Sequence, residues 1–130
     1  MNTEEDSMSD ETQKLVYIFT AAGDRAEDAV TGFTLANVAI SMEHEVTIIL
    51  LGEGTLLALK GYSETVHAPE RLPHKELLTN FLSSGGELLV CLPCIKGRKM
   101  ELSDLVEGVE ATTAVMVNER IIEGDKIITF

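Results

Sequence analysis

Cysteines and long apolar segments are both scarce in this sequence. Only two cysteines occur in 130 residues, too few for a secreted scaffold that disulfides hold together. The N-terminal residues MNTEEDSMSDETQ contain no positive region followed by an apolar stretch, so they do not indicate a secretory signal. The longest apolar runs, 46–51 and 88–92, are far shorter than the roughly 18 to 20 residues that a membrane span needs. We therefore expect a cytoplasmic protein that does not span a membrane.

Basic residues are also few. Ten Lys and Arg stand against 22 Asp and Glu, which gives a net charge of −12. Nucleic-acid binding requires clustered bases that neutralise phosphates, so this composition argues against a nucleic-acid partner. Residues 1–13 contain five acids, no base and little apolar surface. We expect them to form an acidic disordered tail that precedes a single folded domain over residues 14–130.

Apolar strands and amphipathic helices alternate along the rest of the chain. The apolar or β-branched runs predict strands over residues 15–20, 46–51, 87–92 and 126–130. Helical periodicity and end signals predict helices over residues 24–42, 73–84 and 112–122, with short helical segments at 56–61 and 102–106. Asp24 and Glu27 resemble a capping box at the first helix. The pattern predicts an α/β protein: a single three-layer α/β/α domain with a mostly parallel sheet of about five strands.

Both cysteines follow the third predicted strand, in the stretch ELLVCLPCIKGRK. In parallel α/β folds, reactive groups gather at the carboxyl ends of the strands. A helix that begins near Pro93 would favour a thiolate through its dipole, and the cations Lys96 and Arg98 would favour it further. A thiolate attacks a disulfide, persulfide or peroxide, and a second thiol can resolve the product. We therefore take Cys91 and Cys94 as candidate catalytic residues, and Lys96 and Arg98 as candidate thiolate-stabilising residues.

Other interpretations of these residues remain open or are weaker. Two close cysteines can be inert, because free cysteine is among the most buried residue types. His67 and His74 are too widely spaced for a typical zinc pair, and we interpret them as polar residues of an irregular stretch. No metal site and no cofactor are expected. The sequence contains no G-x-S-x-G turn, and Gly52-x-Gly54 is too short to indicate a phosphate loop.

The order of these segments resembles a known family. Several segments occur in the order seen in the DsrE/DsrF-like family of small sulfur-relay proteins, some of which are labelled peroxiredoxin-like. These segments are LVYIFT, VTIILL with GEGTLLALKG, a double glycine, ELLVCLPC, DLVEGVE and KIITF. The resemblance covers nearly all of residues 14–130. It implies a three-layer α/β/α fold, assembly as homotrimers or hexamers, and a cysteine after a central strand that carries a persulfide between partner proteins. By its position relative to Arg98, Cys91 matches that cysteine, whereas Cys94 is an addition.

The resemblance leads to a concrete expectation of function. We expect a cysteine persulfide carrier or sulfurtransferase in a sulfur relay, with Cys91 as the acceptor, Cys94 as a resolving or auxiliary thiol, and donor and acceptor proteins as partners. One alternative is a noncatalytic oligomeric interaction module whose cysteines are structural. Another is a thiol peroxidase or disulfide reductase that uses the Cys91-x-x-Cys94 pair. The sequence does not identify the sulfur donor or acceptor.

Overall fold

A five-stranded parallel sheet forms the middle layer of the protein. The computed structural model describes residues 11–130, and residues 1–10 of the expected tail lie outside this range. The strand order is β4-β3-β2-β1-β5, and every neighbouring pair is parallel. The strands are β1 (Lys14–Phe19), β2 (Glu45–Leu50), β3 (Glu87–Cys91), β4 (Val109–Thr112) and β5 (Lys126–Thr129).

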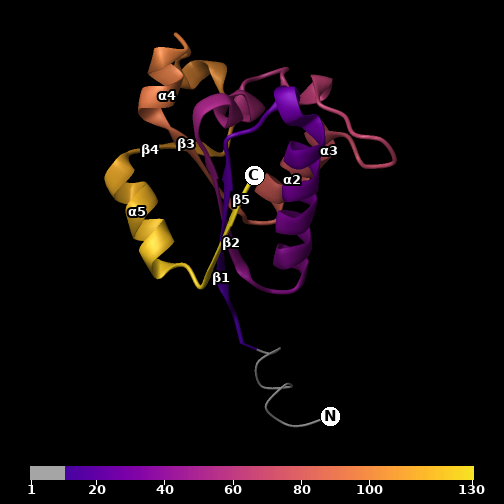
Figure 1. Ribbon diagram of the computed structural model, residues 1–130, viewed down its shortest axis with the longest axis vertical. Coiled ribbons are helices and arrows are strands. Elements are labelled where there is room, and N and C mark those ends of the chain that lie inside the picture. Colours follow the sequence, from indigo (N-terminus) through magenta and orange to yellow (C-terminus); the bar gives the residue numbers. More distant parts are fainter. Residues whose placement is uncertain (1–10) are drawn as a thin grey trace.

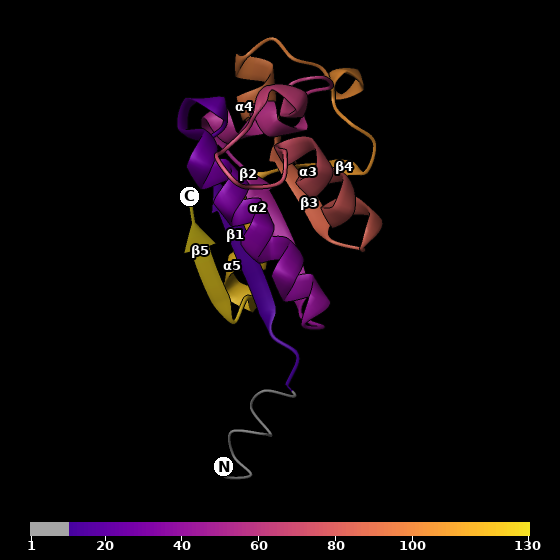
Figure 2. The same ribbon diagram turned by 90° about the vertical axis from the view of Figure 1, so that its right-hand side faces the viewer.

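Helices cover both faces of this sheet. The first face is covered by α2 (Ala26–Ser41) and α3 (His74–Ser83), and the second by α5 (Ala114–Glu123), as Figure 1 shows. Figure 2 shows α2 and α3 in front of the sheet and α5 behind it. A short helix, α4 (Leu92–Gly97), lies at the carboxyl ends of the strands. The predicted α/β class and its three-layer α/β/α arrangement are confirmed.

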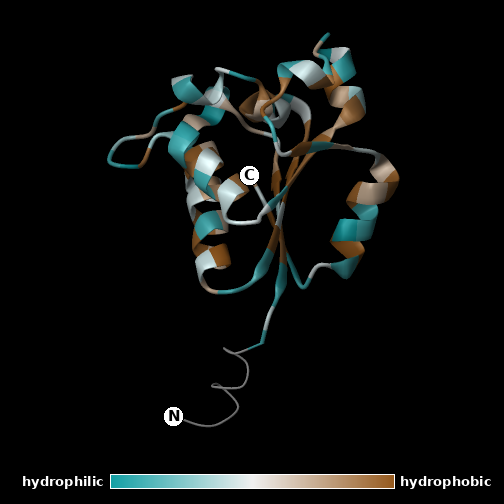
Figure 3. Ribbon diagram, turned by 180° about the vertical axis from the view of Figure 1, so that it is seen from behind, coloured by the Kyte–Doolittle hydropathy of each residue, from teal (hydrophilic) through white to brown (hydrophobic). Residues whose placement is uncertain are grey.

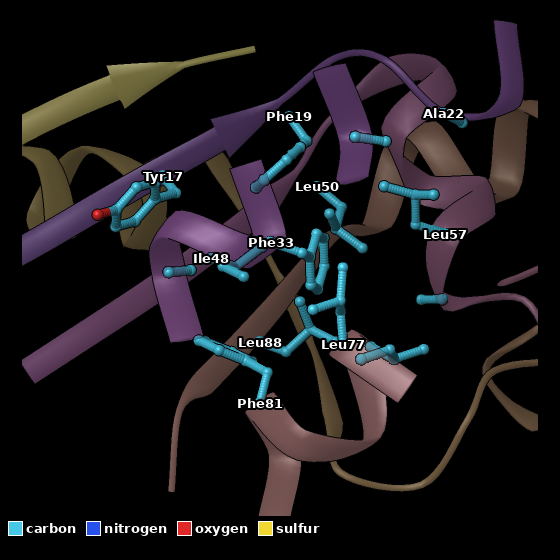
Figure 4. Close-up of a cluster of buried hydrophobic side chains, with 14 of the residues drawn as sticks. Tyr17, Phe19, Ala22, Phe33, Ile48, Leu50, Leu57, Leu77, Phe81 and Leu88 are labelled. Atoms are coloured by element: carbon cyan, nitrogen blue, oxygen red, sulfur yellow. The ribbon is translucent and has the colours of Figure 1, made fainter. Parts of the chain in front are cut away.

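The two faces of the sheet are unequally packed. Successive side chains of a strand point to opposite faces, so Tyr17 and Phe19 of β1 join the large core under α2 and α3, shown in Figure 4. Figure 3 shows hydrophobic strands between helices that mix hydrophobic and hydrophilic residues. Beneath α5 the buried cluster is small, and its members are Val16, Ile18, Ile49 and Leu89. The α5 face therefore depends on few apolar contacts.

One strand was not predicted from the sequence. Residues 109–112 form β4, which pairs with β3, and the helix expected over residues 112–122 begins only at Ala114. The strand has four residues, and only Thr112 is fully buried. Its sequence, VEAT, alternates apolar and polar residues over only four positions, and this short signal was overlooked beside the longer helical pattern that follows it.

Two helix starts also differ from their predictions. The expected capping box of Asp24 and Glu27 is wrong, because α2 begins at Ala26 and the Asp24 Oδ1 atom accepts the Ala22 N–H in the preceding loop, at 2.8 Å. The helical segment expected at 56–61 is instead a 3-10 helix, η2 (Gly52–Ala58). Gly54 within it lies so close to β1 that a Cβ atom there would be 2.2 Å from the Phe19 carbonyl oxygen. This close approach requires glycine and brings the loop against the end of β1.

Across residues 11–130, the structure contains no helix of sufficient length and hydrophobicity to cross a lipid bilayer.

Candidate functional site

The two cysteines lie where β3 ends and α4 begins. Cys91 is the last residue of β3 and the N-cap residue of α4, and Cys94 is in the first turn of that helix. Pro93 fits this first turn because the early N–H groups of a helix have no intrahelical partner. Ile95, which is 1% exposed, anchors α4 in the core. The helix start predicted near Pro93 is therefore confirmed.

The two sulfur atoms are in direct contact. The Sγ atoms of Cys91 and Cys94 are 2.7 Å apart and share a hydrogen bond, and both cysteines are free and half-buried. The Gly52 N–H, from the loop after β2, donates to the Cys94 Sγ atom at 3.4 Å. Gly52 has φ +54, a conformation that glycine adopts without strain. The pair therefore lies between α4 and the segment that follows β2, at the carboxyl ends of two neighbouring strands.

Burial controls the pKa of Cys91. Desolvation raises the pKa of this thiol, and the side-chain hydrogen bond that it shares with Cys94 raises it further. A backbone hydrogen bond from Cys94 and the charge of Arg98 lower the pKa, but they do not offset the two larger effects. The lowered pKa expected from the sequence is therefore wrong for Cys91. At neutral pH its thiol is predominantly protonated.

The neighbouring cations are only partly directed at the thiols. Arg98 forms an ion pair with Glu53, at 3.1 Å from Nη2 to Oε1, and its Nη1 atom donates to the Cys94 carbonyl oxygen at 3.4 Å. The charge of Arg98 is the smallest of the influences on the pKa of Cys91. Lys96 instead lines a neighbouring cavity of about 490 Å³ beside Leu92, Ile95 and Met100. The thiolate-stabilising role expected for Lys96 stays a prediction.

Gly52 and Glu53 belong to the site but were missed in the sequence. The Gly52-x-Gly54 segment was weighed in the sequence as a phosphate loop, for which it is too short. Its position after β2 was nevertheless informative, because carboxyl ends of neighbouring parallel strands meet at one edge of the sheet. Glu53 was not identifiable, because its contact with Arg98 joins residues 45 positions apart.

The histidines do not assemble into a metal site. His74 is not part of the irregular stretch: it begins α3, is fully buried, and its Nδ1 atom lies 2.5 Å from the Ser63 Oγ atom. Burial lowers the pKa of His74 to about 4. His67 is exposed on the preceding loop. Among residues 11–130, no group of three or more His, Cys, Asp or Glu side chains is arranged to hold a metal ion.

A comparison with protein-family models identifies the chain. The model of the DsrE/DsrF-like family matches residues 13–130, which include every strand and helix described above. The chain belongs to the DsrE/DsrF-like family. The resemblance noted in the sequence is thereby confirmed.

The chain is also similar to individual proteins, and it shares its fold with a solved structure. The chain is 32% identical over 118 residues to an uncharacterized protein of Methanocaldococcus jannaschii, MJ0989, covering 90% of this chain and 99% of that protein. It is 33% identical over 105 residues to an uncharacterized protein of Methanopyrus kandleri, MK0008, covering 80% and 83% of the two chains. The crystal structure of the ychN protein from E. coli has the same fold, with a TM-score of 0.78, 22% identity, and coverage of 92% of this chain and 100% of that one.

Proposed function

We propose that this DsrE/DsrF-like protein is a cytoplasmic persulfide carrier or sulfurtransferase that passes sulfane sulfur from a donor protein to an acceptor protein. The observation that carries the proposal is the contact between two half-buried thiols at the carboxyl end of β3. Family membership supports the chemistry, because sulfur relay is a function that the resemblance implies. Cys91 is the acceptor and Cys94 the auxiliary thiol.

Loading is a thiol exchange on the sulfane sulfur of a donor persulfide. The Cys91 thiolate attacks the outer sulfur of the donor, a new sulfur–sulfur bond forms at Cys91, and the donor leaves as its thiolate and takes up a proton. Because the pKa of Cys91 is raised, this attack requires removal of its proton first. Loading should therefore accelerate with rising pH, and a donor that contributes a nearby base would favour it.

Two alternatives make different use of the same residues. A dithiol peroxidase or disulfide reductase is favoured by the 2.7 Å contact, since both reactions end with a disulfide between neighbouring thiols. An interaction module with structural cysteines is less well supported, because structural cysteines are usually fully buried and both of these are half-buried.

Intact-mass spectrometry of the full chain after incubation with glutathione persulfide tests the proposal. We expect Cys94→Ser to gain one sulfur atom and Cys91→Ser to gain none, because a serine hydroxyl cannot form a persulfide. Incubation with hydrogen peroxide in place of the persulfide tests the peroxidase alternative. Equal loss of loading in both variants would contradict the assignment of Cys91 as acceptor, and the absence of loading in every form would contradict the sulfur-handling function.

A further inference from the structure

The Cys91–Cys94 pair is arranged for a reaction between its own two sulfur atoms. The atoms are 2.7 Å apart, so a disulfide bond of about 2.05 Å needs a further approach of only about 0.7 Å. Cys91 is held by β3, which pairs with strands on both sides, and Cys94 by a helix whose Ile95 is buried. The two thiols are therefore positioned by regular elements rather than by a loose loop.

From this contact we infer that the protein releases its bound sulfur as hydrogen sulfide, by closing a disulfide between Cys91 and Cys94. The inference rests on the proposed function, since it begins from the persulfide on Cys91. The Cys94 sulfur attacks the inner sulfur of that persulfide, a Cys91–Cys94 bond forms, and the bond to the outer sulfur breaks. The outer sulfur leaves as hydrosulfide and takes up the proton of the Cys94 thiol.

The electrons of this step balance within the protein. The sulfane sulfur gains two electrons and becomes sulfide, while the two cysteine sulfurs lose one each and become a disulfide. A dithiol reductant of the thioredoxin type, represented in vitro by dithiothreitol, then returns the disulfide to two thiols. The cycle as a whole transfers electrons from that dithiol to sulfane sulfur.

The environment of Cys94 suits the attacking role. The Gly52 N–H points at the Cys94 sulfur from a separate loop, and it gives a negative charge on that atom a hydrogen-bond donor. Attack within a chain also has an advantage over attack by a dissolved thiol, because well-oriented intramolecular reactions reach effective molarities of about 10⁵–10⁸ M. Sulfide release therefore competes with delivery to an acceptor protein, and it prevails when no acceptor is bound.

The test follows sulfide and protein mass after loading. The full-length wild-type chain and Cys94→Ser are loaded with glutathione persulfide without oxygen, and the donor is removed by desalting. We expect wild type to release one sulfide per chain, at a rate independent of protein concentration. The product should be lighter than the unloaded, reduced chain by two hydrogen atoms, which is the mass of the disulfide form. Cys94→Ser should keep its extra sulfur atom, with sulfide release slower by at least about 100-fold.

The controls separate this inference from the proposed function. Cys91→Ser defines the background of sulfide from residual donor, and Cys94→Ala repeats the test without a hydroxyl. If wild type keeps the extra sulfur as long as Cys94→Ser does, or if release scales with protein concentration, the inference is overturned while loading stands. If neither Cys94 variant gains sulfur and wild type yields neither sulfide nor disulfide, the proposed function itself fails.

Discussion

At the scale of single residues, Cys94 influences the pKa of Cys91 more than the nearby cation Arg98 does. The Cys94 side chain raises the pKa of Cys91 through a hydrogen bond and through its charge, whereas Arg98 lowers it least of all the contributors. The two cations that follow Cys94, Lys96 and Arg98, indicated a lowered thiol pKa in the sequence. Burial outweighs them, because removing a thiolate from water disfavours its charge.

Replacing Cys94 should therefore activate Cys91. In Cys94→Ala the side-chain hydrogen bond is lost, while the backbone N–H that favours the Cys91 thiolate remains. We expect the pKa of Cys91 to fall and its alkylation near neutral pH to become faster than in wild type. Iodoacetamide labelling across pH, with the site identified by peptide mass spectrometry, measures this change. An unchanged pH profile at Cys91 would show that the contact with Cys94 does not control the thiol.

Replacing Arg98 should shift the pKa of Cys91 in the opposite direction to replacing Cys94, and by less. Arg98→Gln removes a charge that lowers the pKa of Cys91, so we expect a higher pKa and slower alkylation near neutral pH. Lys99→Gln is the matched control, because it removes a neighbouring exposed cation that does not contribute to this pKa. The same labelling experiment compares the two variants. An equal effect of both would mean that Arg98 acts only through the general potential of the segment.

His74 gives the fold a sensitivity to acid. Its pKa falls from 6.5 to about 4 on burial, so the unfolded chain binds a proton between these values and the folded chain does not. The contribution of neutral His74 to the free energy of unfolding is fully present above about pH 6.5, and it is lost as the pH falls toward 4. We expect the free energy of unfolding of wild type to lose about 3 kcal/mol more than that of His74→Gln over this range. Urea denaturation at several pH values measures it, and parallel curves for the two proteins would exclude His74 as the cause.

At the scale of elements, an ion pair joins α5 to the sheet beside the half-buried apolar side chains of Met116, Val117 and Ile121. Arg120 of α5 binds Glu87 of β3 with two hydrogen bonds, at 2.8 and 3.0 Å, and the Thr47 hydroxyl donates to the same carboxylate. Within residues 114–123, no side chain is fully buried. The hydrogen bond from Arg120 is also the main reason why the pKa of Glu87 is lowered. The pair is only partly exposed, so solvent screens it less than a surface ion pair.

Breaking this ion pair should loosen α5 alone. In Glu87→Gln the charge is lost, and we expect faster amide hydrogen exchange over residues 114–123 with little change in α2. Glu123→Gln is the control, since Glu123 is the more exposed partner of Arg120, at 53% against 32% for Glu87. In wild type, the contribution of Glu87 is present above its unfolded pKa and is lost as the pH falls through its lowered folded pKa. Exchange that rises equally in all helices would contradict a local role.

The sequence was sufficient for elements with a buried, continuous pattern. Three central strands and the helices α2 and α3 were predicted to within a few residues, because burial on both faces produces long apolar runs. β4 was missed, since its pairing with β3 is decided by the sheet more than by its own four residues. The residues of the site also fall into those that the sequence identified and those that it did not. The cysteines were found, whereas Gly52 and Glu53 depend on contacts between distant segments.

At the scale of the whole molecule, apolar side chains remain exposed on two helices. Along α2 and just past its end they lie three and four residues apart, which is the spacing of one helical face. The exposed residues are Leu35 and Val38 on α2, Met42 directly after its end, and Val115 and Ile122 on α5, the last two 71% and 81% exposed. Exposed apolar side chains that gather on one face of a helix are typical of protein interfaces. This arrangement supports the proposal that copies of this chain associate, as homotrimers or hexamers.

Association should be measurable and should depend on these faces. We expect sedimentation velocity at micromolar concentration to give a mass well above that of one chain. Val115→Glu with Ile122→Glu tests the α5 face, and Leu35→Glu with Val38→Glu tests the α2 face, because a charge buried at an interface is costly. The helical content of each variant serves as the folding control. A stable wild-type monomer would contradict the proposal.

The position of β1 in the sheet has a consequence for how the protein is made. Its neighbours are β2, which follows soon in the sequence, and β5, whose adjoining residue Asp125 bonds to Lys14 across 111 positions. During synthesis β1 therefore leaves the ribosome long before its second partner exists. Until β5 emerges, one side of an apolar strand carries unpaired N–H and C=O groups, which other chains can pair with. Newborn copies of this protein are thus most prone to aggregate in the interval before translation reaches β5.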